Sequence, residues 1–159
     1  MAALVAAGYP LIADDILPLA EEPRGVWPVP FALSVKQGSW PVLAGRFPEL
    51  EHARIFTAGE RQVRYLWPRP GAVVPVDRPI PVAGILFPHY EPGTAVEVQL
   101  LRPLQALALL AQSGSRLGIE PEKVEPLVAW LGSLPAFDVA LDELDEAVSW
   151  LDQLIGPPG

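Results

Sequence analysis

The fold of this chain is decided by the stretch Ala2-Ala3-Leu4-Val5-Ala6-Ala7-Gly8-Tyr9-Pro10-Leu11-Ile12-Ala13-Asp14-Asp15. Small and apolar residues over Ala2–Ala7 predict a short helix, and the following Gly-Tyr pair predicts a turn. Apolar residues over Pro10–Ala13 predict a strand that runs directly into the carboxylates of Asp14 and Asp15. We therefore expect two carboxylates at the C-terminal end of a strand.

An acidic residue at the end of such a strand is typical of nucleotide-binding proteins of the P-loop class. In these proteins a phosphate loop leads into a helix, and a neighbouring strand ends in an acidic residue that holds the metal ion. The chain contains no G-x-x-x-x-G-K-[ST] sequence, and the usual spacing would place that loop a few residues before Met1. The N-terminal stretch is therefore expected to be the second half of a nucleotide site.

Composition and charge exclude several classes of protein. The chain has 159 residues, of which 50% are hydrophobic, so one domain with a sizeable core is expected. Its net charge is -8 and its 11 Lys and Arg residues are scattered, which argues against nucleic acid as a partner. The absence of cysteine excludes disulfides and thiolate chemistry. The apolar N-terminus lacks the basic residues of a secretory signal, and no stretch is long enough to span a bilayer, so a cytoplasmic protein without a membrane partner is expected.

Prolines divide the chain into two halves. Fourteen of the 20 prolines lie between Pro10 and Pro92, and because each lacks a backbone N–H, this half is expected to form strands and loops. The non-alternating run Ala83–Phe87 predicts a fully buried central strand. The strands predicted from residue type and flanking turns are Val26–Val29, Trp40–Leu43, Gln62–Trp67, Ile80–Phe87 and Ala95–Leu101.

The hydrophobic period changes to 3.6 residues after Leu101. This period predicts one helix from Pro103 to near Ser113, a second that ends at Gly132, and a third with Asp142 as its N-cap. A short strand is expected over Phe137–Leu141, between the last two helices. The predicted fold class is α/β, mixed α+β, with a mixed sheet and C-terminal helices in one domain over residues 1–159.

Four segments resemble those of one enzyme family in the same order along the chain. Besides Ala3–Asp15, the run Leu33-Ser34-Val35-Lys36-Gln37-Gly38-Ser39-Trp40 resembles a strand that starts with "LK-x-G-S". The run Phe87–Gly93 resembles a "FP-x-[FY]-x-PG" turn, and Phe137–Leu154 resembles a closing strand and a "L-x-E-A-V-x-x-L" helix. Together these segments resemble the C-terminal portion of HPr serine kinase-like proteins, without their P-loop, over nearly the whole chain.

The resemblance implies a partial phosphoenolpyruvate carboxykinase-like fold and the use of ATP and Mg²⁺. It implies a segment of a phosphotransferase that acts on a hydroxyl of a protein, a peptide or a small molecule. Because the phosphate loop is absent, the chain alone is expected to be inactive. The "R-G-x-G" signature of the regulatory enzymes is also absent, which argues against HPr itself as the substrate. The alternative function is a non-catalytic scaffold of the same ancestry that binds a peptide or protein partner.

The requirements of phosphoryl transfer suggest roles for the acidic pair. One carboxylate can hold Mg²⁺, and a second can accept the proton of the acceptor hydroxyl. We assign the metal to Asp15 and the role of catalytic base to Asp14. Adjacent residues on a strand point to opposite faces, so these roles require that the strand breaks at the pair and that the two side chains fan apart. The alternative is a solvated strand end or a cap for the next turn.

The sequence suggests binding or contact roles for three further side chains. Lys36 and Ser39 are predicted to contact the nucleotide phosphates through an ammonium and a hydroxyl group, the alternative being a surface lysine before a turn. Trp150 lies off the apolar stripe of the last helix. Because the regulatory members of the family are oligomeric, an exposed Trp150 would indicate a homo-oligomer contact.

Overall fold

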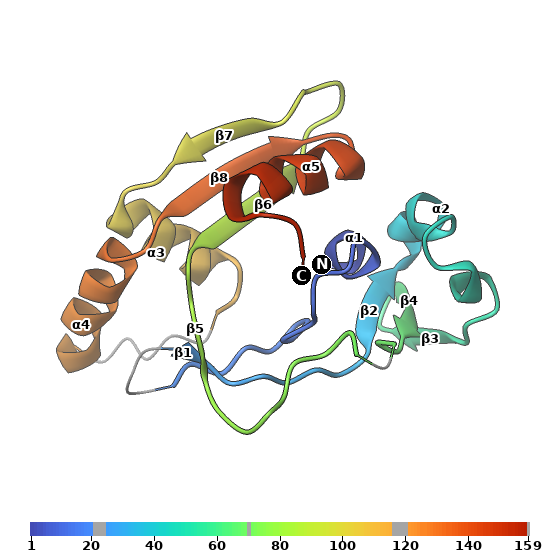
Figure 1. Ribbon diagram of the computed structural model, residues 1–159, viewed down its shortest axis with the longest axis horizontal. Helices are drawn as coiled ribbons and strands as arrows, with labels where there is room; N and C mark the ends of the chain where they lie inside the picture. The colour runs from blue at the N-terminus through green and yellow to red at the C-terminus, as the bar shows by residue number, and fades with distance from the viewer. Residues whose placement is uncertain (21–24, 70, 116–120, 159) are drawn as a thin grey trace. The chain divides into compact units, whose positions relative to one another are not determined.

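The computed structural model describes residues 1–20, 25–69, 71–115 and 121–158 (Figure 1). It is a mixed α/β structure with several small sheets and a few helices, which confirms the predicted class. The chain forms two compact units, Met1–Ile80 with Leu151–Gly159, and Pro81–Trp150. No helix in the described ranges is long and apolar enough to cross a membrane.

The N-terminal stretch forms the predicted helix but not a regular strand. Helix α1 spans Ala2–Ala6. After it, Leu11 and Ala13 are buried and make only isolated parallel bridges, to Val73 and Val29 respectively. The reason is the sequence of one partner segment, in which Val29 is flanked by two prolines that have no N–H to continue a ladder.

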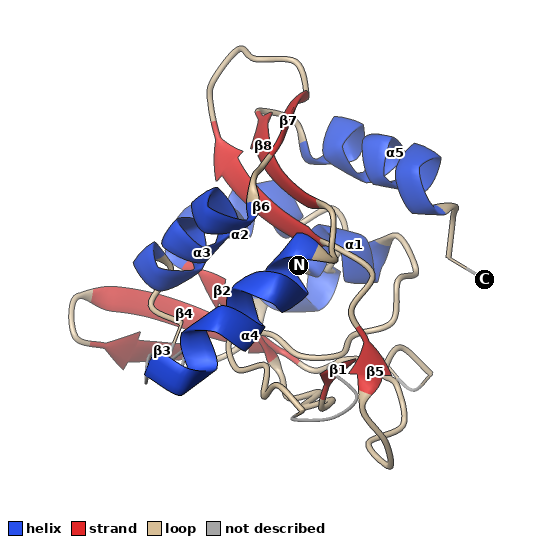
Figure 2. Cartoon of the chain, turned by 90° about the vertical axis from the view of Figure 1, so that its left-hand side faces the viewer, coloured by secondary structure: helices blue, strands red, loops and turns tan. Residues whose placement is uncertain are grey.

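The first unit contains a three-stranded antiparallel sheet in the order β2-β4-β3. Figure 2 shows β3 and β4 as neighbouring strands. The buried face of β2 carries Leu33 and Val35, whereas Ser34 is half-buried and Lys36 is exposed on the opposite face. The strands are β2 (Leu33–Lys36), β3 (Ile55–Ala58) and β4 (Arg61–Leu66), and β1 (Gly25–Val26) pairs with β5 (Ile80–Pro81).

The strand predicted over Trp40–Leu43 is wrong, because these residues form helix α2. The β-forming side chains of this segment favour a strand. Pro41, however, occupies the first helical turn, where a backbone N–H has no partner within the helix, so its absence loses no hydrogen bond. The indole Nε1 of Trp40 donates to the carbonyl oxygen of Val35 at 2.9 Å, which ties α2 back to β2. Two short 3₁₀ helices flank α2, Gln37–Ser39 before it and Pro48–Glu51 after it.

The second unit contains a mixed sheet in the order β6-β8-β7 (Figure 1). Strand β6 (Ile85–Tyr90) is parallel to β8 (Ala136–Leu141), and β7 (Glu97–Leu100) is antiparallel to it. The prediction of one strand over Ile80–Phe87 is therefore wrong, and so is the prediction of a fully buried central strand over Ala83–Phe87, because residues 83–84 are exposed and 85–87 are only half-buried. Residues 80–81 form β5, a separate strand, and the central strand is β8.

Pro88 explains why β6 lies at an edge of this described sheet. The backbone N–H groups of Ile85 and Glu91 donate to carbonyl oxygens at positions 135 and 141. The backbone N–H groups of odd-numbered residues in β6 therefore point toward β8. Pro88 is even-numbered, so its backbone nitrogen points away from β8, and the missing N–H breaks no hydrogen bond of the ladder.

Three helices follow the predicted 3.6-residue period: α3 (Pro103–Gln112), α4 (Pro121–Gly132) and α5 (Leu144–Ile155). Asp142 is not the N-cap of α5, because that helix begins at Leu144. The Asp142 carboxylate instead accepts a bond from the Gly93 N–H at 2.8 Å, and its bond to the Tyr90 hydroxyl raises the pKa of Tyr90. Trp150 is half-buried and packs edge-to-face on Phe137, with ring centroids 6.3 Å apart, so it does not form the exposed patch that would have indicated a subunit contact.

Candidate functional site

The two carboxylates of the N-terminal stretch converge on one serine of strand β2. Oδ2 of Asp14 accepts bonds from the Ser34 N–H at 2.7 Å and from the Ser34 hydroxyl at 2.8 Å. Oδ2 of Asp15 lies 3.0 Å from the same hydroxyl oxygen. The backbone bends at both Asp residues directly after the bridge at Ala13. The extended segment thus breaks at the acidic pair, which lets adjacent side chains reach the same point.

The hydroxyl of Ser34 cannot satisfy both carboxylates at once. A hydroxyl has one proton, and two carboxylate oxygens lie within 3.0 Å of it. Because the Ser34 backbone N–H also donates to Asp14, the hydroxyl proton is available to Asp15, and the two carboxylates lie close together. A bound cation is one way in which two such carboxylates can be stabilised.

Lys36 shares a face of β2 with Ser34. The two residues are two positions apart, so their side chains point to the same side of the strand. Because the Ser34 N–H donates to Asp14, it points away from β4, and the Ser34–Tyr65 pair is a non-hydrogen-bonded pair with close side chains. Lys36 is exposed on this face.

Ser39 does not share this arrangement. It lies in the 3₁₀ turn after β2, is exposed, and its side chain does not cap α2. The structure therefore brings Asp14, Asp15 and the face that carries Lys36 together around Ser34, and it leaves Ser39 beyond the end of the strand.

The donor atoms around Ser34 suit a hard cation. Two carboxylates and a hydroxyl supply only oxygen, and Mg²⁺ commonly takes one or two carboxylates together with phosphate oxygens and waters. Within the described ranges, no group of three or more His, Asp or Glu side chains is placed so that it could hold a metal ion. Burial lowers the pKa of the Met1 amino group while the Asp14 carboxylate acts to raise it, which places this negative charge near the start of α1.

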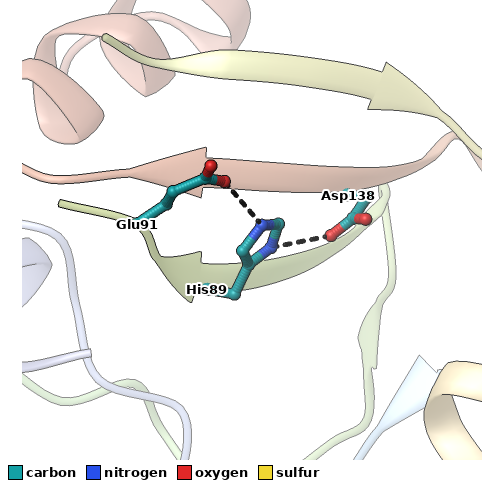
Figure 3. Close-up of polar contacts among 3 residues, drawn as sticks. All are labelled: His89, Glu91 and Asp138. Atoms are coloured by element: carbon teal, nitrogen blue, oxygen red, sulfur yellow. Dashed lines mark hydrogen bonds and ion pairs between the residues drawn. The ribbon is translucent and has the colours of Figure 1, made fainter. Parts of the chain in front are cut away.

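A second polar cluster lies in the other unit, on strands β6 and β8. The imidazole of His89 lies between two carboxylates, with Nδ1 3.1 Å from Asp138 Oδ1 and Nε2 3.8 Å from Glu91 Oε2 (Figure 3). The "FP-x-[FY]-x-PG" segment was expected to form a turn, but residues 85–90 form β6, so His89 lies on a strand. The three side chains are about one-third to one-half exposed.

An open groove of about 570 Å³ runs beside this cluster. Five consecutive residues of β6 contact it, and since neighbouring residues on a strand face opposite ways, the groove follows the strand edge. Its opposite wall is the C-terminal end of α3. The lining residues are Ile85, Leu86, Phe87, Pro88, His89, Leu109, Leu110, Ser113 and Asp138.

Sequence reasoning did not identify Ser34 or Asp138. The alternation in Leu33-Ser34-Val35-Lys36 could have shown that Ser34 and Lys36 share the polar face of a strand. No local pattern links Asp138 to His89, because 49 positions separate them and only the parallel pairing of β6 with β8 brings them together.

Comparisons of this chain with protein-family profiles, with curated proteins and with solved structures found no match.

Proposed function

We propose that this chain is the segment of an HPr kinase-like, ATP-dependent phosphotransferase that carries the acidic side of the nucleotide site. The proposal includes a partial phosphoenolpyruvate carboxykinase-like fold. The acceptor would be a hydroxyl of a protein, a peptide or a small molecule. The observation that carries the proposal is the convergence of Asp14 and Asp15 on the Ser34 hydroxyl at a break in an extended segment.

Each residue of this site has a distinct role in the proposal. Asp15 is exposed and would hold Mg²⁺, which supplies charge neutralisation for the phosphates when bound. Asp14 is more enclosed, is fixed by the Ser34 backbone N–H, and would accept the proton of the acceptor hydroxyl. Lys36 would approach the phosphates from the same face of β2. Ser34 would orient the two carboxylates.

Calorimetric titration with Mg²⁺-ATP tests this proposal. If the reading frame upstream of Met1 encodes a strand followed by G-x-x-x-x-G-K-[ST], the extended protein is expected to bind Mg²⁺-ATP. Asp15→Asn should weaken this binding by about 10- to 100-fold, because it removes a charged ligand without changing the size of the side chain. Asp14→Asn should bind nucleotide with little change and lose phosphoryl transfer.

A matched control is Glu60→Gln, which removes one negative charge from the exposed β3–β4 turn of the same unit. This variant should bind Mg²⁺-ATP as the wild type does. Equal affinity of the wild type and Asp15→Asn, or undetectable heat for both, would contradict the proposal. The chain would then be interpreted as the non-catalytic scaffold.

A further inference from the structure

The bonding of His89 determines which of its ring nitrogens is free to accept. An ionised carboxylate only accepts hydrogen bonds, so in the neutral form of the imidazole the proton lies on Nδ1, which is 3.1 Å from Asp138 Oδ1. The Nε2 atom then presents a lone pair. This lone pair faces Glu91 Oε2 at 3.8 Å, and that oxygen is also an acceptor.

Two acceptors that face each other need a shared donor. The 3.8 Å separation is too long for a direct hydrogen bond between Nε2 and Oε2. An ammonium group carries three N–H donors and a positive charge, so it can donate to Nε2 and to the Glu91 carboxylate together. A carboxylate or phosphate ligand would meet the negative charges of Glu91 and Asp138, which lie at the Nε2 and Nδ1 sides of the imidazole (Figure 3).

The groove beside the cluster supplies an apolar surface for the rest of such a ligand. Phe87, Leu109 and Leu110 line it together with the polar residues His89, Asp138 and Ser113, so most of the lining is apolar. Glu91 does not line the groove and reaches it through its contact with His89. A volume of about 570 Å³ lies within the range of small-molecule sites. Pro88 leaves no backbone donor at the centre of this strand edge, which argues against an added peptide strand as the occupant.

We propose that this groove binds a small organic amine with an apolar body, whose ammonium group donates to His89 Nε2 and Glu91. Asp138 is a positioning residue, because it holds the imidazole in the tautomer that accepts at Nε2. The site lies entirely within residues 85–138 and does not depend on the proposed nucleotide site in the other unit.

Proton–nitrogen correlation NMR of the full chain with phenethylamine tests this proposal, with 2-phenylethanol as a neutral ligand of similar shape. The measurement is made at about pH 8, where histidine is ordinarily neutral. Phenethylamine is expected to shift backbone signals of residues 85–89 and 109–113 and to bind about fivefold more tightly than the alcohol, as a partly exposed charge contact allows. Glu91→Gln should remove this preference, while binding of the alcohol stays unchanged.

Two further variants make the interpretation specific. Asp138→Asn should move the imidazole proton from Nδ1 to Nε2, which nitrogen-15 spectra of the ring detect, and should remove the amine preference although Glu91 is intact. Glu125→Gln, on the exposed surface of α4, removes the same charge away from the groove and should change nothing. Equal affinity for amine and alcohol, signal shifts outside the groove, or no binding of either ligand would overturn the proposal.

Discussion

At the scale of single residues, Tyr9 links the turn after α1 to helix α5. Its hydroxyl donates to Asp152 Oδ1 and lies 3.0 Å from the Gly156 carbonyl oxygen. The bond to Asp152, followed by burial and the Asp152 charge, raises the pKa of Tyr9 to about 12. Because this exceeds the unfolded value of about 10, the stabilisation is complete below about pH 10 and is lost as pH rises through 12. Urea unfolding should therefore show Tyr9→Phe less stable than the wild type at neutral pH, with the difference vanishing in this alkaline range. A difference that does not change with pH would contradict this assignment.

At the scale of elements, helix α4 contains a proline in its interior. Pro126 is exposed and has no N–H to donate to the Glu122 carbonyl oxygen one turn earlier. Pro126→Ala should restore this bond and raise the free energy of unfolding by about 1–3 kcal/mol, partly offset by the greater freedom of the unfolded chain. Equilibrium urea unfolding measures the change. The matched variant Ala129→Pro, also exposed on α4, should change stability in the opposite direction, and a loss of stability in Pro126→Ala would show that the proline is required.

At the scale of the whole molecule, large apolar side chains remain exposed in the described chain. Trp67 is 77% exposed, Phe31 69% and Leu104 67%. Exposed large apolar side chains promote association, and the short sheets of the described chain also leave strand edges without a partner. We predict that the 159-residue chain self-associates as its concentration rises, measured by light scattering after gel filtration. Trp67→Ser with Phe31→Ser should reduce this association. A wild-type chain that stays monomeric and melts cooperatively would contradict the prediction.

The helices α1, α3, α4 and α5 and the strands β4, β7 and β8 could be predicted from local pattern. The period of 3.6 residues placed all three C-terminal helices, and the short apolar run before α5 placed β8 within one residue at its start. The errors fell on segments rich in both β-forming side chains and proline. In α2 the position of Pro41 outweighed β propensity, and in β6 Pro88 required an edge position that apolar composition did not indicate.

The candidate nucleotide site was predicted in part. Asp14 and Asp15 follow an apolar run, which is visible in the sequence, and the structure places both carboxylates against Ser34. Their assigned roles, and those of Lys36 and Ser39, stay predictions. Ser34 lies 20 positions from Asp14, so no helical or strand period connects them. Only the position of β2 beside the N-terminal segment creates that contact.

The sequence by itself determined the C-terminal helices, which half is divided by prolines, and where two adjacent carboxylates end an apolar run. These properties depend on residues a few positions apart, whose side chains repeat on one face of an element. The tertiary structure alone decided that Ser34 lies between Asp14 and Asp15, and that His89 meets Asp138 beside an apolar groove. These contacts depend on strand order and register, which follow from the packing of distant segments and from the edge position that Pro88 imposes.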